Sequence, residues 1–195
     1  MYKLVTDATT PVVTVTDAKK HLRVTDNESN STIESLVAAA TKFVQNKTRR
    51  QLINATYRVS MRQFPMGGGV IELPRSPASS VTSIAYIDEN GVSQTWSSSN
   101  YILDSDSEPG RITEAYEQNY PSTRIQDGGV LITYVAGYGA ASTDVPDDLI
   151  HAVKLILGHW FENREAVITG TISSAISLAV DAILSQYEMP KVHWS

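Results

Sequence analysis

The sequence predicts an α+β fold, in which about four helices form a small core and an antiparallel β region is inserted between the second and third helices. Apolar residues recur with a helical period near both ends of the 195-residue chain, whereas from residue 55 to residue 138 the period changes to two. Gly, Pro, Asn and Asp interrupt this middle part, as the turns of an antiparallel sheet require. The predicted division is therefore an N-terminal helical part over residues 1–54, a β region over 55–140, and C-terminal helices with a tail over 141–195 that complete the helical core.

Two helices are expected before the β region. Thr14–Arg23 is predicted to form a short strand or turn and then a short helix capped by Thr16. Ser31 and Glu34 have the spacing of a capping box, so a second helix is expected to follow and to run to about Arg50. Its buried face is predicted to consist of Ile33, Leu36, Val37, Ala40, Phe43 and Val44.

Short strands of alternating polarity are expected in the middle of the chain. Asn90-Gly91 predicts a two-residue hairpin turn. Gly67-Gly68-Gly69 lacks the Lys-Ser/Thr of a phosphate loop and is interpreted as a hairpin tip. Arg111–Gln126 shows no period and is expected to be a long excursion. The six predicted strands lie near Tyr57–Phe64, Val70–Leu73, Val81–Ile87, Ser93–Trp96, Tyr101–Leu103 and Val130–Val135.

Two further helices are expected after the β region. Pro146 suits a first helical turn, and Asp147 and Asp148 suit the positive end of the helix dipole. A last helix is expected over Ser174–Tyr187, and Pro190 ends it. The apolar stripe of the third helix is predicted to consist of Leu149, Ile150, Val153, Ile156, Leu157, Trp160 and Phe161.

Composition argues against several functional classes. The chain has no cysteine, which removes disulfides, thiolate metal sites and cysteine nucleophiles. No apolar run indicates secretion or membrane insertion. The formal net charge of −5 opposes general binding to phosphate backbones. The basic cluster of Lys47, Arg49 and Arg50 is best explained as favourable charge at the C-terminal end of a helix.

No constellation of residues indicates catalysis, a cofactor or a metal site. His151, His159, Glu162 and Glu165 are the best candidates, but only His159 and Glu162 could share a helix face locally, and a metal needs three or four ligands. The carboxylates of Asp104, Asp106 and Glu108 lack the glycine and the later Glu of a calcium loop and are interpreted as a polar turn. No Gly-x-Ser-x-Gly elbow is present.

Two places offer apolar surface to another chain. Leu155 and Gly158 lie away from the main stripe of their helix, although Leu155 is nearly as well explained as a stray exposed residue. The tail carries Pro190, Val192 and Trp194, and Trp194 is either an anchor for a partner or a ring folded back on its own subunit. These five residues are the candidate partner-binding residues.

Segments spread over nearly the whole chain resemble, in order, the head–tail connector (head-completion adaptor) proteins of tailed bacteriophages and gene transfer agents. His159–Glu165, with its Trp-Phe-Glu-Asn-Arg-Glu helix ending, is the strongest of them. The C-terminus departs from the family pattern, because Val180–Tyr187 is followed by Glu188 where the family has a Tyr-Arg ending. The other matching segments are Val15–Arg23, Arg50–Ile53, Phe64-Pro65, Ile71–Pro77, Val81–Asp88, Asn90-Gly91, Tyr134–Tyr138 and Val145-Pro146.

The resemblance implies a structural virion protein without catalysis, made in the cytoplasm of the host bacterium and located in the neck of the virion. It implies a dodecameric ring that sits beneath the portal protein, offers its other side to a stopper or tail-completion protein, and lets genomic DNA pass without specific binding or any contact with a membrane. Two alternatives stay open. One is a cytosolic metal-binding or small-molecule enzyme domain using His159, Glu162 and Glu165, and the other is a different neck or tail-completion part.

Overall fold

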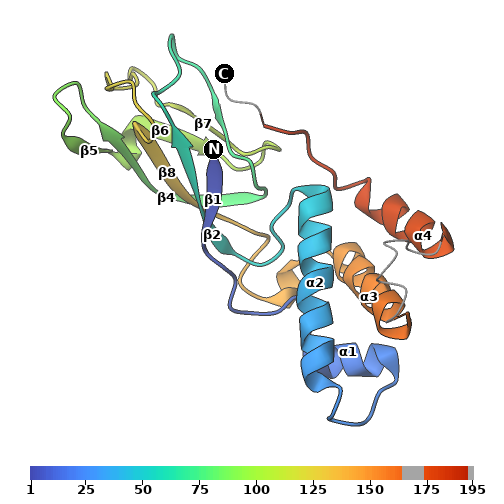
Figure 1. The fold of residues 1–195 in the computed structure, drawn as a ribbon. Helices are drawn as coiled ribbons and strands as arrows, with labels where there is room; N and C mark the ends of the chain where they lie inside the picture. Colours follow the sequence, from blue (N-terminus) through green and yellow to red (C-terminus); the bar gives the residue numbers. More distant parts are fainter. Residues whose placement is uncertain (164–173, 193–195) are drawn as a thin grey trace. The chain divides into compact units, whose positions relative to one another are not determined.

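The chain folds into two compact units, one helical and one built of β-strands. The computed structural model describes residues 1–163 and 174–192, with the backbone alone for residues 174–177. The helical unit consists of Thr9–Ile53 and Gly139–Glu188, and the β unit consists of Met1–Ala8, Asn54–Tyr138 and Met189–Ser195. The order along the chain in Figure 1 confirms the predicted α+β fold with strands inserted between the second and third helices.

Four α-helices make up the described part of the helical unit: α1 (Val15–Leu22), α2 (Asn30–Thr48), α3 (Asp147–Glu162) and α4 (Ser174–Leu184). Helices α1, α3 and α4 all contact α2, and α3 also contacts α1 and α4. A short 3₁₀ helix, η2 (Ser142–Asp144), precedes α3. The interior of the unit contains Ile33, Val37, Ala40, Val44, Leu149, Val153, Ile156, Leu157, Val180 and Leu184, all of which are buried.

The helix starts differ from the sequence prediction. Thr14, not Thr16, caps α1, because its hydroxyl accepts a hydrogen bond from the Asp17 N–H at 3.1 Å. The capping box predicted from Ser31 and Glu34 is wrong: α2 begins at Asn30, so Ser31 already lies inside the helix. The chain is held before this start by Asp26, whose carboxylate accepts from the N–H of Ser29 at 3.1 Å.

The β unit contains a five-stranded antiparallel sheet in the order β1-β2-β8-β4-β5 and a three-stranded sheet in the order β3-β7-β6. Its core is formed by side chains from both sheets. Tyr134 of β8 pairs with Tyr57 of β2 and with Val81 of β4, which places its ring in the middle of the larger sheet. The bounds are β1 (Tyr2–Thr6), β2 (Ala55–Met61), β3 (Ile71–Glu72), β4 (Ala78–Ile87), β5 (Ser93–Trp96), β6 (Tyr101–Asp104), β7 (Arg111–Glu114) and β8 (Val130–Ala136), with a 3₁₀ turn, η1 (Ser98–Asn100), before β6.

Two strands were missed by the sequence prediction. Strand β1 pairs with β2 at the edge of the larger sheet, and every residue of β1 is exposed. It therefore lacks the buried alternation that identifies a strand. This pairing places residues 1–8 with the β unit and not with the N-terminal helices, and the tail from Met189 also groups with the β unit.

Strand β7 lies inside the segment expected to be an excursion and pairs with both β3 and β6. The division into domains otherwise stays a prediction.

Two turn predictions need correction. The hairpin from β4 to β5 has three residues between Asp88 and Val92, whose backbones are joined by a 2.9 Å hydrogen bond, and the positive φ (+84°) falls on Gly91 within this loop. This geometry is the three-residue hairpin with a left-handed glycine and not the two-residue turn. The Gly67–Gly69 segment is not a hairpin tip, because β2 and β3 belong to different sheets and the glycines connect them.

No helix in the described part of the chain has both the length and the apolar character needed to cross a membrane.

Candidate interaction surfaces

The end of α3 uses its polar residues to close the helix. His159 is only 7% exposed, and its backbone C=O accepts from the Asn163 N–H at 3.0 Å. The Asn163 side-chain amide lies 3.2 Å from Nδ1 of His159 and 3.0 Å from the same carbonyl oxygen. His151 is exposed, and within residues 1–163 and 174–192 no three His, Asp or Glu side chains gather as metal ligands. Glu165 lies outside the described residues.

Trp160 is half-buried, whereas its place in the apolar stripe predicted a buried ring. It meets Phe43 of α2 edge-to-face, with 6.1 Å between ring centroids. A position that remains partly in water loses less on truncation than a core position does. We therefore expect Trp160→Ala to lower the free energy of unfolding by about 2 kcal/mol, below the 3–5 kcal/mol typical of a buried Trp.

Urea denaturation followed by far-UV circular dichroism measures this change. His159→Ala is the companion variant, and we expect it to leave ring assembly intact. Stoichiometric zinc in the purified wild-type protein would contradict the structural role of His159.

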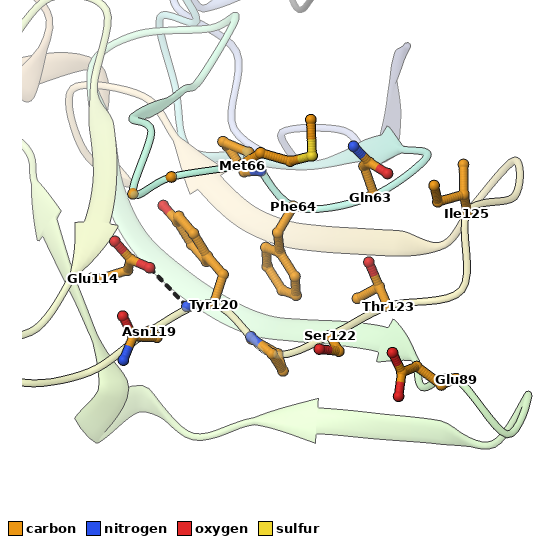
Figure 2. A pocket seen from close by; sticks show the side chains of 14 residues that line it. Gln63, Phe64, Met66, Glu89, Glu114, Asn119, Tyr120, Ser122, Thr123 and Ile125 are labelled. Carbon is orange, nitrogen blue, oxygen red and sulfur yellow. Dashed lines mark hydrogen bonds between the residues drawn. The ribbon is translucent and has the colours of Figure 1, made fainter.

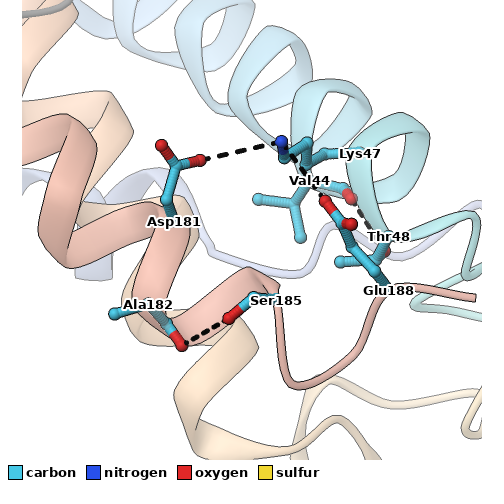
Figure 3. Close-up of polar contacts among 7 residues, drawn as sticks. All are labelled: Val44, Lys47, Thr48, Asp181, Ala182, Ser185 and Glu188. Atoms are coloured by element: carbon cyan, nitrogen blue, oxygen red, sulfur yellow. Dashed lines mark hydrogen bonds and ion pairs between the residues drawn. The ribbon is translucent and has the colours of Figure 1, made fainter.

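The basic cluster at the end of α2 is engaged in contacts within the helical unit. Nζ of Lys47 lies 3.2 Å from the Glu188 carboxylate and 3.8 Å from that of Asp181, as Figure 3 shows. Arg50 is buried, and its Nε donates to the backbone C=O of Tyr187 at 2.8 Å. Its guanidinium also lies 5.6 Å from the centre of the Tyr187 ring. These contacts join the end of α2 and Arg50 just after it to α4 and to the segment that follows α4. They support the structural explanation of the cluster over a nucleic-acid patch.

The carboxylate of Asp104, at the end of β6, organises a polar turn. The Asp104 carboxylate accepts from the N–H groups of Asp106 and Ser107, each at 3.1 Å, and from the Ser107 hydroxyl. These hydrogen bonds, the one from the Ser107 side chain first, hold the pKa of Asp104 below its ordinary value. The acceptor capacity of Asp104 is thus used within its own loop, as the interpretation of a polar turn requires.

The five candidate partner-binding residues lie in two places. Leu155 and Gly158 of α3 are half-buried, and a Cβ placed on Gly158 would lie 3.6 Å from Nε2 of His21 in α1. This face of α3 is therefore partly in contact with α1. Helix α4 ends at Leu184. In the segment that follows it, Met189 is buried, Pro190 is exposed and Val192 is half-buried. Trp194 lies outside the described residues. The partner-binding role of all five residues stays a prediction.

The structure also reveals a groove in the β unit that the sequence did not predict. It has a volume of about 520 Å³ and opens between the β2–β3 connection and the segment after β7. The rings of Phe64 and Tyr120 stack on its floor, with centroids 4.9 Å apart and planes 14° from parallel. Figure 2 shows Met66 and Ile125 on the groove walls, and both are largely exposed. We call it the acidic groove, because Glu89 and Glu114 are the charged side chains in its lining.

Hydrogen bonds fix the floor of the acidic groove. The Tyr120 N–H donates to the Glu114 carboxylate at 2.7 Å, and the Tyr120 hydroxyl donates to the backbone C=O of Gly69 at 2.8 Å. Burial, with a smaller effect of the Glu114 charge, raises the pKa of Tyr120 to about 12. The phenol is therefore neutral at physiological pH, and the hydrogen bond from its hydroxyl to Gly69 fixes the position of the ring. The sequence contains two aromatic-proline pairs, Phe64-Pro65 and Tyr120-Pro121, but no local pattern predicted that the two rings would stack and form a groove.

Comparison with known proteins assigns the chain to a family. The family model described as "Head completion protein" matches residues 11–188. No curated protein matches in sequence. Several solved structures have similar chains, and in three of them the comparison covers 100% of this chain and 98% of the other.

These structures are described as the neck of an empty gene transfer agent (GTA) particle computed with C6 symmetry (23% identity, TM-score 0.80), the virion of a native GTA particle (22%, 0.80) and the neck of a native GTA particle computed with C12 symmetry (24%, 0.73). The likenesses establish a shared fold across the full chain. The family match over residues 11–188 confirms the sequence resemblance: this protein belongs to the head completion protein family.

Proposed function

We propose that this protein is a head–tail connector, a structural subunit that forms a ring in the neck of a tailed phage or gene transfer agent and joins the DNA-filled head to the tail. The observation that carries the proposal is the family match over residues 11–188. The fold is that of chains from gene transfer agent necks, at a TM-score of 0.80 over the full length. A structural role needs no catalytic group, and the connector is proposed to work through its surfaces alone.

Several properties of the chain support this role. Two of the similar neck structures were computed with C6 and C12 symmetry, which supports self-association into a ring, and the C12 case supports twelve subunits. A subunit with net charge −5 makes a ring acidic overall, so DNA can pass without being held. In the basic cluster at the end of α2, Lys47 pairs with Glu188 and Asp181, and Arg50 donates to Tyr187, so these cations are engaged within the subunit.

The proposed partners are the portal protein on one side of the ring and a stopper or tail-completion protein on the other. The C-terminal segment from Pro190 is proposed to dock on the portal, since Pro190 and Lys191 are exposed after the helical unit ends. Leu155 and Gly158 are proposed to contact a second chain through the part of α3 that α1 leaves open.

The test is to mix the purified protein with purified portal and to image the product by electron microscopy. We expect an added ring beneath the portal and a mass increase corresponding to twelve subunits. An unrelated acidic protein of the same size serves as the control. Portal that remains bare at a large excess of this protein would contradict the proposed function.

We expect weak or absent binding of the isolated protein to duplex DNA at physiological salt. The reason is the acidic balance of the subunit, because non-specific DNA affinity comes mainly from clustered Lys and Arg that release counterions. Fluorescence anisotropy with a labelled duplex at several salt concentrations measures it. Submicromolar binding with a steep salt dependence would show that the channel holds DNA.

A further inference from the structure

The acidic groove has the chemistry of a site for cationic side chains. Its described lining contains Glu89 and Glu114 and no Lys or Arg. Figure 2 shows Glu114 beside Tyr120, whose N–H donates to it, and Glu89 among the other lining residues. A carboxylate in a groove favours an ammonium or guanidinium group, which can donate charge-assisted hydrogen bonds to it.

The chain itself carries an exposed basic segment. Two segments hold three Lys or Arg within five residues, namely 47–50 and 19–23. The first is tied into the helical unit by Glu188 and by Tyr187. The second, which we call the α1 basic turn, consists of Lys19, Lys20, His21 and Arg23 at the end of α1.

The α1 basic turn presents its charges to solvent. His21 and Arg23 are exposed, and the Lys20 side chain is 75% exposed. Lys20 lies 3.5 Å from Asp17, itself 51% exposed, and such a surface pair contributes little to stability. Nζ of Lys19 donates to the Asn27 side chain at 2.8 Å and holds the loop after α1. Lys20 and Arg23 are therefore the two cations best placed to reach another molecule.

We propose that the α1 basic turn of one copy of this chain docks into the acidic groove of a neighbouring copy. The inference rests on the proposed ring and names one contact that holds it. A ring closes through heterologous contacts, in which two different surfaces of the subunit meet. The groove belongs to the β unit and the basic turn to the helical unit, so the two surfaces are distinct and opposite in charge.

The contact brings Lys20 and Arg23 of one copy to Glu89 and Glu114 of the next. Glu114 is already bonded to the N–H of Tyr120, which fixes its carboxylate for the incoming cation. Because the participating charges are partly in water, the contact supplies register and partner choice, and it weakens as salt rises.

The natural absence of cysteine allows a direct test. One preparation carries Lys20→Cys and another carries Glu89→Cys. The two are mixed and treated with a short bis-maleimide, both as concentrated protein and after binding to portal. We expect covalent dimers in the mixture and few in either preparation alone. A Ser83→Cys protein mixed with the Lys20→Cys protein is the control, because Ser83 lies on β4 outside the groove.

Charge reversal gives an independent measurement. We expect Lys20→Glu and Glu89→Lys each to weaken self-association by about tenfold, and the double variant Lys20→Glu/Glu89→Lys to recover most of it. Thermal unfolding of each variant shows that the fold is kept, as expected for exposed positions. If the two losses of self-association affinity add in the double variant, with no recovery, the proposed contact is wrong.

The outcomes separate this inference from the proposed function. Rings on portal without any Lys20–Glu89 cross-link overturn the contact and leave the connector role standing. Cross-links from Glu89→Cys to portal or to a stopper protein show that another neck protein occupies the groove, which also overturns it. Cross-linked dimers in concentrated protein that never binds portal support the contact and contradict the connector role.

Discussion

Leu157→Ala is expected to lower the free energy of unfolding by about 2–5 kcal/mol, the largest stability loss that we predict for a single substitution. Leu157 is 0% exposed and belongs to α3, which packs against both α2 and α4. Removing three carbons from such a position loses their burial and leaves a cavity that the surrounding helices fill only in part. Such a loss is a large fraction of the roughly 5–15 kcal/mol by which natural domains are stable.

The matched control is Leu178→Ala in α4. Its side chain is 71% exposed, so the same chemical change is expected to cost less than about 0.5 kcal/mol. Urea titration followed by circular dichroism at 222 nm reports on the helical unit in both variants. Similar unfolding midpoints for the two variants would show that α3 is not packed as described.

Truncation after Met189 is expected to abolish docking on portal while leaving thermal unfolding nearly unchanged. The deletion keeps the buried Met189 and removes the exposed Pro190 and Lys191, the half-buried Val192, and three further residues that include Trp194. Little burial is lost among the described residues of this segment. An aromatic anchor that enters a partner's pocket typically supplies 2 kcal/mol or more, which is a loss of about 30-fold or greater in affinity.

Portal binding by surface plasmon resonance and a thermal melt measure the two parts of this prediction. Trp194→Ala and His193→Ala separate the aromatic ring from the rest of the segment, since only the former is expected to lose docking. Wild-type affinity in the truncated protein would refute the docking role of the C-terminus. A large fall in melting temperature would instead show that the segment stabilises its own subunit.

The sequence by itself determined the elements that carry a complete local signal. Strand β5 has the predicted bounds of Ser93–Trp96, and α3 follows its predicted apolar stripe with Leu149, Val153, Ile156 and Leu157 all buried. Periodic burial of one face imposes these patterns on adjacent residues, so they can be recognised without knowing the partner element. The order of the four helices and of the six predicted strands followed from such local signals, whereas the family resemblance rests on particular segments such as His159–Glu165.

Only the tertiary structure decided the features that depend on distant residues. Strand β1 exists because β2 supplies its hydrogen-bond partners, and β7 exists because β3 and β6 do. The acidic groove combines residues 63–68 with Glu89, Glu114, residues 119–123 and Ile125. The Lys47 cluster acquired its structural role from Asp181 and Glu188, more than 130 residues later in the chain. Edge strands, grooves and ion pairs of this kind form by long-range pairing, which leaves no periodic trace in the local sequence.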